Sequence, residues 1–270
     1  SAEVAHLIKN SEAYGIKVDG FSFDLKKIVE RSRGVAKQLS GGVGHLLKKN
    51  KVTVIDGYGR LKGKGQVEVE KKDKTKETLS AKHIIVATGA RARVFPGLEA
   101  DGKLVWSYRE AMVPDVMPKS LLVIGSGAIG TEFASFYLNL GVDVTLVEVM
   151  DRILPVEDEE ISGLAQKAFI KQGMKILTNA KVAKLDKAAN SVTAHIEVGG
   201  KTEKITVDRV ISAVGISPNT EDIGLANTKV KTDRGHIVTG KYSETDEPGV
   251  YAIGDVAGAP WLAHKASHEG

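Results

Sequence analysis

The amino-acid sequence predicts an α/β protein of two similar modules, each combining a parallel sheet with a three-stranded β-meander. Residues 121–148 read as strand, glycine-rich turn, helix and strand, the order found in parallel α/β sheets. A strand–meander–strand–glycine pattern occurs twice, over 51–89 and 175–215. A further apolar run, Val250 to Ile253, is followed at once by Gly254-Asp255, which places an acid where a buried strand ends.

Composition narrows the class of protein. The 270 residues are 42% hydrophobic and 27% charged, as in soluble globular proteins, and no apolar run approaches the roughly 18 residues that span a bilayer. We therefore expect no membrane partner, and a cytoplasmic location or, in a eukaryote, the mitochondrial matrix. The lysine clusters that produce the net charge of +4 lack interleaved aromatics, so we expect no nucleic-acid partner. The absence of cysteine excludes disulfides, thiolate metal sites and a cysteine nucleophile within these residues, and we expect no metal.

The first half of the chain reads as helices followed by a meander. Residues 1–13 are expected to form a helix, and residues 23–49 a long amphipathic helix in which Gly41 and Gly42 each cost about 1 kcal/mol unless something packs closely there. Residues 52–86 alternate in character, which indicates short strands starting at 52 and leading into a buried strand, Ile84 to Ala87. Residues 90–120 form a connection.

The central element is a dinucleotide-binding fingerprint. After the strand Leu121 to Ile124, three glycines fall in the spacing G-x-G-x-x-G: Gly125, Gly127 and Gly130. The first permits a tight turn, the second lets backbone approach a pyrophosphate, and the third lets the helix pack on the strand. The free N–H groups at the helix N-terminus then face the phosphates. This context predicts a Rossmann-like module.

Glu148 ends the next strand, Val142 to Val147, about 20 residues downstream, as the fingerprint requires. Its carboxylate can accept hydrogen bonds from a ribose 2′-hydroxyl and would repel a 2′-phosphate. The sequence therefore favours NAD over NADP.

The second half repeats the first. A helix is expected over Glu157 to Gln172, a strand over Lys175 to Leu177 and a second meander over 182–214. Gly215 follows Gly125 by 90 residues, and the same spacing counted back from Gly89 falls before Ser1. The first module thus lacks its own phosphate-binding turn, and we expect the chain to be a fragment that also ends mid-helix at HKASHEG.

A second nucleotide site is indicated by two features. Asp255 follows a buried strand in an α/β pattern, where ligands bind, although a helix N-cap alone would also explain it. An ATG turn at Thr88–Ala90 precedes the fingerprint. Together they favour a flavin site.

The motifs VIGSGAIGTEF, VATGA, AVGISPN, YAIGDVAG and LAHKASHEG, in this order, resemble the flavoprotein pyridine nucleotide-disulfide oxidoreductases over essentially the whole chain. The run GGVGHLLKKNKV together with LAHKA favours the branch that oxidises dihydrolipoamide. The resemblance implies two Rossmann-like modules, one for FAD and one for NAD, with the FAD module incomplete. It implies domains over 1–118 (FAD, partial), 119–245 (NAD) and 246–270 (FAD).

The resemblance also implies site residues. For NAD they are Gly125, Ser126, Gly127, Ala128, Ile129, Gly130, Glu132, Glu148, Val182 and Gly215. Glu132 would lie near the nicotinamide–flavin stack, although it also reads as an ordinary helix-surface acid. For FAD they are Gly59, Thr88, Gly89, Ala90, Asp255, Trp261, Leu262, Ala263 and His264, the last four through backbone N–H groups.

The function implied for the intact protein is electron transfer from dihydrolipoamide through a disulfide and FAD to NAD. The implied partners are a lipoyl-bearing acyltransferase of a 2-oxoacid dehydrogenase complex and, for the full-length form, a second copy. No catalytic residue of that reaction is present, because the redox cysteines and the C-terminal His–Glu pair are absent, so the fragment alone should be inactive. The alternatives are a thiol-independent NADH oxidase or diaphorase, another family member such as mercuric reductase or transhydrogenase, and a non-catalytic NAD-binding module.

Overall fold

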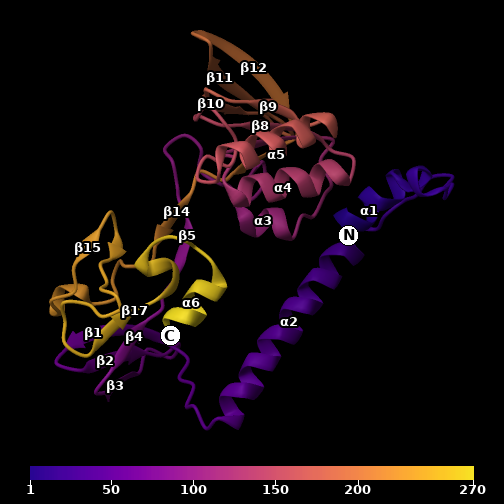
Figure 1. Cartoon of the computed structure of the whole chain (residues 1–270). Helices are drawn as coiled ribbons and strands as arrows, with labels where there is room; N and C mark the ends of the chain where they lie inside the picture. The colour runs from indigo at the N-terminus through magenta and orange to yellow at the C-terminus, as the bar shows by residue number, and fades with distance from the viewer. The chain divides into compact units, whose positions relative to one another are not determined.

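The computed structural model describes residues 1–270, which form two compact units (Figure 1). Unit 1 contains residues 1–40 and 92–215, and unit 2 contains residues 41–91 and 216–270. These limits differ from the expected boundaries at 118 and 245. Residues 92–118 lie in unit 1 because Val105–Trp106 form a strand of its sheet, and residues 216–245 lie in unit 2 because Ile223 and Ile237 join its core.

Unit 1 is built on a five-stranded parallel sheet with the strand order β6-β13-β7-β8-β9. Its strands are β6 (Val105–Trp106), β13 (Arg209–Ser212), β7 (Ser120–Ile124), β8 (Asp143–Val147) and β9 (Lys175–Leu177). Helices α4 (Ala128–Asn139) and α5 (Glu159–Lys171) connect β7 to β8 and β8 to β9, as crossovers between parallel strands require. The expected strand–turn–helix–strand order of 121–148 is confirmed.

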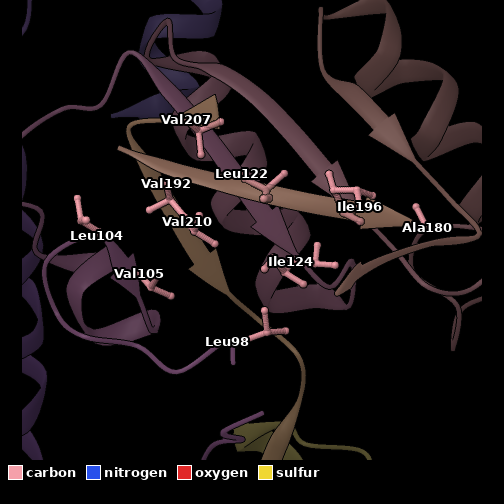
Figure 2. Packing of buried hydrophobic residues seen from close by; sticks show 13 residues of the cluster. Leu98, Leu104, Val105, Leu122, Ile124, Ala180, Val192, Ile196, Val207 and Val210 are labelled. Atoms are coloured by element: carbon pink, nitrogen blue, oxygen red, sulfur yellow. The ribbon is translucent and has the colours of Figure 1, made fainter. Parts of the chain in front are cut away.

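The two faces of this sheet are covered by different structures. Along β7, Leu121 and Val123 pack toward the helices, whereas Leu122 and Ile124 pack toward the meander, because successive side chains of a strand point to opposite faces. The meander has three antiparallel strands, β10 (Ala180–Lys187), β11 (Val192–Val198) and β12 (Lys201–Val207). Figure 2 shows the residues that pack between meander and sheet, Val192 and Ile196 among them. A sheet buried on both faces explains why residues 121–124 of β7 form a continuous apolar run.

The remaining helices of unit 1 are α1 (Ala2–Lys9), α3 (Tyr108–Met112) and the first part of α2 (Leu25–Lys49), with a 3₁₀ turn at Ser11–Tyr14. The expected helix over 1–13 is thus an α-helix followed by a 3₁₀ turn. α2 matches the helix expected over 23–49, and none of its residues is buried. Nothing lies within 4 Å of a Cβ built on Gly41 or Gly42, so no close contact offsets their cost in helix propensity.

Unit 2 holds the first meander, a short parallel pair and small elements around one core. The meander is β1 (Tyr58–Gly63), β2 (Gln66–Glu70) and β3 (Lys76–Ser80), and the pair is β4 (Ile84–Val86) with β17 (Val250–Ala252). The other elements are β5 (Ala90–Ala92, whose last residue lies in unit 1) paired with β14 (Ile216–Pro218), β15 (Thr232–Asp233) with β16 (His236–Ile237), 3₁₀ turns at Leu225–Asn227 and Gly254–Ala257, and α6 (Ala263–Glu269).

The internal repeat is confirmed in its meanders and the strands that follow them. Each meander has three antiparallel strands and leads to a strand, β4 or β13, and then to a glycine of positive φ, Gly89 or Gly215. The strand expected from residue 52 is wrong: residues 52–57 belong to no strand, and Val54 is 63% exposed. The equivalent β9 is a strand because it pairs with β8, whereas 52–57 have no partner strand in this chain.

The buried strand expected at Ile84 to Ala87 is correct in position and only partly buried, because Val86 joins the core of unit 2 and Ile84 packs against it. β4 pairs only with β17, and Ile85 is 54% exposed. The apolar pattern of this segment is typical of a strand inside a covered sheet, but in this chain the segment belongs to a two-stranded sheet. None of the helices combines the length and apolar character needed to cross a bilayer.

The core of unit 1 contains one buried side-chain hydrogen bond whose contribution can be tested directly. Tyr137 is fully buried, its ring lies against Phe136 and Trp106, and its hydroxyl donates to the carbonyl oxygen of Ala111 at 2.8 Å. Burial raises the pKa of this phenol. We expect Tyr137→Phe to lower the free energy of unfolding by about 1–2 kcal/mol, because the buried carbonyl loses its side-chain partner.

The measurement is urea unfolding followed by Trp106 fluorescence in a Trp261→Phe background, so that only unit 1 reports. The matched control is Tyr14→Phe, since Tyr14 also belongs to unit 1, is 72% exposed, and its hydroxyl makes no hydrogen bond within the chain. Equal transition midpoints for the two variants would contradict the expectation.

Candidate dinucleotide-binding site

The turn from β7 into α4 presents an uncapped helix N-terminus at the carboxyl end of the sheet. α4 begins directly after Gly127, no side chain caps it, and its first turn carries no acidic residue. The N–H groups of the first turn of a helix have no intrahelical acceptor, and the helix dipole is positive there. This end of α4 is therefore suited to bind a phosphate.

Gly125 and Gly130 are required by the backbone itself. Gly125 has φ +94°, in the left-handed region, and a Cβ built on it would collide with the carbonyl oxygen of Ala213. A Cβ on Gly130 would collide with the carbonyl oxygen of Gly125. The first glycine lets the turn pass the end of β13, and the last lets α4 pack directly against the turn.

Gly127 is different, because neither its backbone conformation nor its neighbours within the chain require a glycine at this position. Its φ of −62° and ψ of 179° suit any residue, and nothing lies within 4 Å of a Cβ built there. No side chain of the chain occupies this approach to the helix N-terminus. A Cβ at Gly127 would instead fill the space through which a pyrophosphate would reach the backbone.

Glu148 lies beside the turn and is only 6% exposed. Its Oε2 accepts hydrogen bonds from the N–H of Ser126 at 2.8 Å and from the hydroxyl of Ser126 at 2.7 Å. Its Oε1 accepts from the N–H of Met150 at 2.9 Å. Each carboxylate oxygen can accept about two hydrogen bonds. Oε2 already accepts two and Oε1 accepts one, so one acceptor position on Oε1 is left for a ligand hydroxyl.

The structure thus brings seven of the expected NAD residues together, Gly125 to Gly130 with Glu148. Three others lie elsewhere in unit 1. Val182 is buried in the core beneath the meander, at an irregularity in the register of β10. Gly215 is exposed after β13 with φ +104°, and Glu132 is exposed in the second turn of α4. Their contact with a nucleotide stays a prediction.

Unit 2 contains a cleft of about 610 Å³ that brings together Gly59 and Thr88 of the expected FAD residues. The Thr88 hydroxyl donates to the carbonyl of Asn219 at 2.7 Å, and the Asn219 amide donates to the carbonyl of Thr88 at 2.9 Å. The N–H of Asn219 also donates to the carbonyl of Gly89. Three hydrogen bonds therefore fix the Thr88–Gly89 turn.

Sequence reasoning missed the residues that hold this cleft. Asn219 ends the motif AVGISPN, from which we predicted no role for the asparagine. Arg91 donates to both carboxylate oxygens of Glu221, at 2.9 and 2.7 Å, and this ion pair lowers the pKa of Glu221 to about 2. The pairing joins positions 130 residues apart, so no local pattern could have indicated it.

The other expected FAD residues lie outside the lining of this cleft. Asp255 is half-buried in the 3₁₀ turn after β17, and Trp261 stacks on His236 with ring centroids 6.1 Å apart. Ala263 and His264 begin α6, directly after Leu262. Two residues that the sequence did not indicate connect α6 to the Gly254 turn: Lys265 donates to the Gly254 carbonyl, and Glu269 accepts from the Gly254 N–H. The turn that carries Asp255 is fixed by these bonds.

Comparison with known proteins identifies the family. The family model described as pyridine nucleotide-disulphide oxidoreductase matches residues 3–270. The chain belongs to this family. It is 51% identical to a dihydrolipoyl dehydrogenase of Rhizobium etli and 38% identical to one of Bacillus subtilis, in each case over the whole chain. It spans 60% and 59% of the lengths of those relatives, and 79% of a 41% identical dihydrolipoyl dehydrogenase of Acholeplasma laidlawii.

The fold comparison agrees with the sequence comparison. The structure of LpdA from Mycobacterium tuberculosis superposes with a TM-score of 0.91 at 26% identity, covering 99% of this chain and 58% of that one. The flavoprotein disulfide reductase RclA of Escherichia coli superposes with a TM-score of 0.80 at 25% identity. The expected α/β class with Rossmann-type modules is confirmed, and the family uses FAD and NAD.

The residues of unit 1 fit a dinucleotide on the evidence of the turn itself. Open space at Gly127, uncapped N–H groups on α4 and a remaining acceptor on Glu148 meet at one place. Gly125–Gly130 would hold the pyrophosphate, and Glu148 would hold the adenosine ribose.

The three turn glycines give a test that separates folding from binding. We expect Gly127→Ala to keep the melting temperature of the chain and to weaken NADH binding by about tenfold or more, because the added methyl fills the phosphate approach. We expect Gly130→Ala to lower the melting temperature as well, because its Cβ meets backbone. Thermal melting and NADH titration calorimetry measure the two effects.

The matched control is Gly163→Ala in α5, where a Cβ meets nothing within 4 Å and which should gain up to about 1 kcal/mol from helix propensity. If the Gly127→Ala chain binds NADH as tightly as the wild type, the pyrophosphate does not bind beside Gly127.

Proposed function

We propose that this chain is the nucleotide-binding part of a dihydrolipoyl dehydrogenase, in which unit 1 binds NAD and unit 2 supplies the adenosine side of an FAD site. The observation that supports it best is the open turn at Gly127 beside a buried acid with one free acceptor position. The similarity to dihydrolipoyl dehydrogenases at up to 51% identity supports the substrate class.

In the proposed reaction, electrons pass from a dihydrolipoyl group through a disulfide and FAD to NAD. The bound cofactors supply the hydride chemistry, and the protein binds and orients them. In unit 1, backbone N–H groups of α4 orient the pyrophosphate, and Glu148 accepts a hydrogen bond from the adenosine ribose. Glu132, exposed on the same helix, is proposed to lie near the nicotinamide.

In unit 2, Gly59, Thr88, Gly89 and Ala90 would contact the adenosine end of FAD, and the Asn219 hydrogen bonds hold that turn in place. Asp255 would accept from the ribityl chain, and the backbone of residues 261–264 would lie under the flavin. The 270 residues contain no cysteine, so the disulfide of the proposed reaction belongs to residues outside them.

The proposed partners are a lipoyl-bearing acyltransferase of a 2-oxoacid dehydrogenase complex and a second copy of the full-length protein. The proposed location is the cytoplasm, or the mitochondrial matrix in a eukaryote. Both proposals rest on the similarity to dihydrolipoyl dehydrogenases.

A second candidate function is a thiol-independent NADH oxidase or diaphorase, whose chemistry needs no cysteine of the protein. The two functions differ in whether a dihydrolipoyl substrate reduces the flavin of the full-length protein anaerobically. Reduction by NADH with no reduction by dihydrolipoamide would favour the oxidase.

Glu148 provides the test of nucleotide selection. We expect the wild-type chain to bind NADH more tightly than NADPH, because a buried carboxylate accepts from a 2′-hydroxyl and repels a 2′-phosphate. We expect Glu148→Gln to weaken NADH by about tenfold and to bring the two dissociation constants together, since a hydrogen bond to a charged group contributes about 1.5–3 kcal/mol.

Titration calorimetry with both nucleotides gives these constants. Glu203→Gln, an exposed acid on β12, is the matched control and should leave both unchanged. Absence of binding heat with NADH at millimolar concentration would reject the proposed function of unit 1.

Flavin content provides a separate test for unit 2. We expect the purified chain of 270 residues to bind NADH and to show no oxidised-flavin absorption band, because its only G-x-G-x-x-G lies in unit 1 and the parallel sheet of unit 2 has two strands. A visible spectrum of the protein after purification in added FAD measures this. A stoichiometric flavin band would show that the residues present suffice for FAD.

A further inference from the structure

We infer that Ser126 is a positioning residue that selects the nucleotide by holding the Glu148 carboxylate in the orientation that accepts a ribose 2′-hydroxyl. This inference rests on the proposed function of unit 1 and adds a residue whose hydroxyl the fingerprint does not specify. In G-x-G-x-x-G the second position carries no side-chain requirement.

Ser126 and Glu148 form a buried pair. Ser126 is fully buried and Glu148 nearly so. Both donors of Ser126 act on the same oxygen: its hydroxyl donates to Glu148 Oε2 at 2.7 Å, and its N–H donates to that oxygen at 2.8 Å. The hydroxyl makes no other hydrogen bond within the chain. A buried hydroxyl directed at a single carboxylate oxygen is placed to fix that oxygen.

Ser126 is itself held from two sides. Its carbonyl accepts from the hydroxyl of Thr131 in α4 at 2.9 Å and from the N–H of Leu154 at 3.0 Å. Leu154 in turn accepts from the buried Ser162 of α5 through its carbonyl. The serine therefore cannot move without disturbing α4 and the segment after β8, and its hydroxyl is a fixed reference for the acid.

The consequence for Glu148 is that its two ends are anchored separately. Oε2 receives both Ser126 donors, while Oε1 receives only the N–H of Met150. The one open acceptor position is therefore on Oε1 and points in a fixed direction. A glutamate loses side-chain rotamer entropy when it is fixed, and here that loss accompanies folding, so it does not reduce the affinity for the nucleotide.

Removal of the hydroxyl should affect the two nucleotides differently. Ser126→Ala keeps both N–H bonds to Glu148 and loses only the hydroxyl bond. Oε2 then has an unfilled acceptor position, and the orientation of the carboxylate is less restricted. NADH then loses an oriented acceptor. NADPH gains, because the carboxylate can turn away from the 2′-phosphate and the repulsion between like charges falls.

The test is titration calorimetry of the whole chain with NADH and with NADPH. For Ser126→Ala we expect the dissociation constant of NADH to rise by roughly 5- to 10-fold and that of NADPH to stay constant or fall, so that the preference for NADH decreases. Ser191→Ala, in the turn between β10 and β11, is the control and should change neither constant.

A double-mutant cycle separates this role from packing. If Ser126 acts through Glu148, Ser126→Ala has no further effect on the preference in a Glu148→Ala chain, where the hydroxyl has no acceptor at position 148. Ser126→Cys keeps most of the volume with a weak S–H donor and should give an intermediate preference. It also replaces the alanine variant if that variant melts below the assay temperature.

An unchanged preference in Ser126→Ala would overturn the inference while leaving the proposed function in place. Two results give it: neither dissociation constant changes, or both rise by the same factor, which would mean a distorted turn. A wild-type chain that binds neither nucleotide would reject the proposed function and the inference together.

Discussion

The close approach of α4 to the turn after β7 is the constraint on which the rest of the site depends. Gly130 rests against the carbonyl of Gly125, and Gly125 rests against the carbonyl of Ala213 at the end of β13. These contacts bring the helix N-terminus to the carboxyl ends of β7 and β13, where parallel sheets bind ligands. Any side chain at either glycine would push the helix away and remove the phosphate position.

The local part of this arrangement could be predicted from the sequence. Apolar runs, glycine spacing and helical periodicity lie within residues 121–148, and the observed β7, α4 and β8 match them closely. The same holds for the two meanders, because strand alternation and polar turns are local signals. Such local signals show that a segment is able to form a helix or a strand.

Whether a segment forms that element depends on partners that the sequence pattern does not identify. Residues 52–57 alternate like a strand and are not one, while Val105–Trp106, too short to show any pattern, form the edge strand β6 through pairing with β13. This pairing also brings residues 92–118 into unit 1. The Ser126–Glu148 contact was missed for a similar reason, because it joins positions 22 apart through side-chain directions that only the fold sets.

The buried acid next to a phosphate site presents an electrostatic problem that the structure solves with hydrogen-bond donors. A carboxylate near a pyrophosphate would oppose its binding if both charges were exposed to each other in a medium of low dielectric constant. Three donors, two from Ser126 and one from Met150, stabilise and partly offset the charge of Glu148. The N–H groups of α4, with no side-chain cap and no acidic residue in the first turn, remain for the phosphates. Because separate donors serve the acid and the phosphate, one short turn can bind an anion and still use a negative charge to select its sugar.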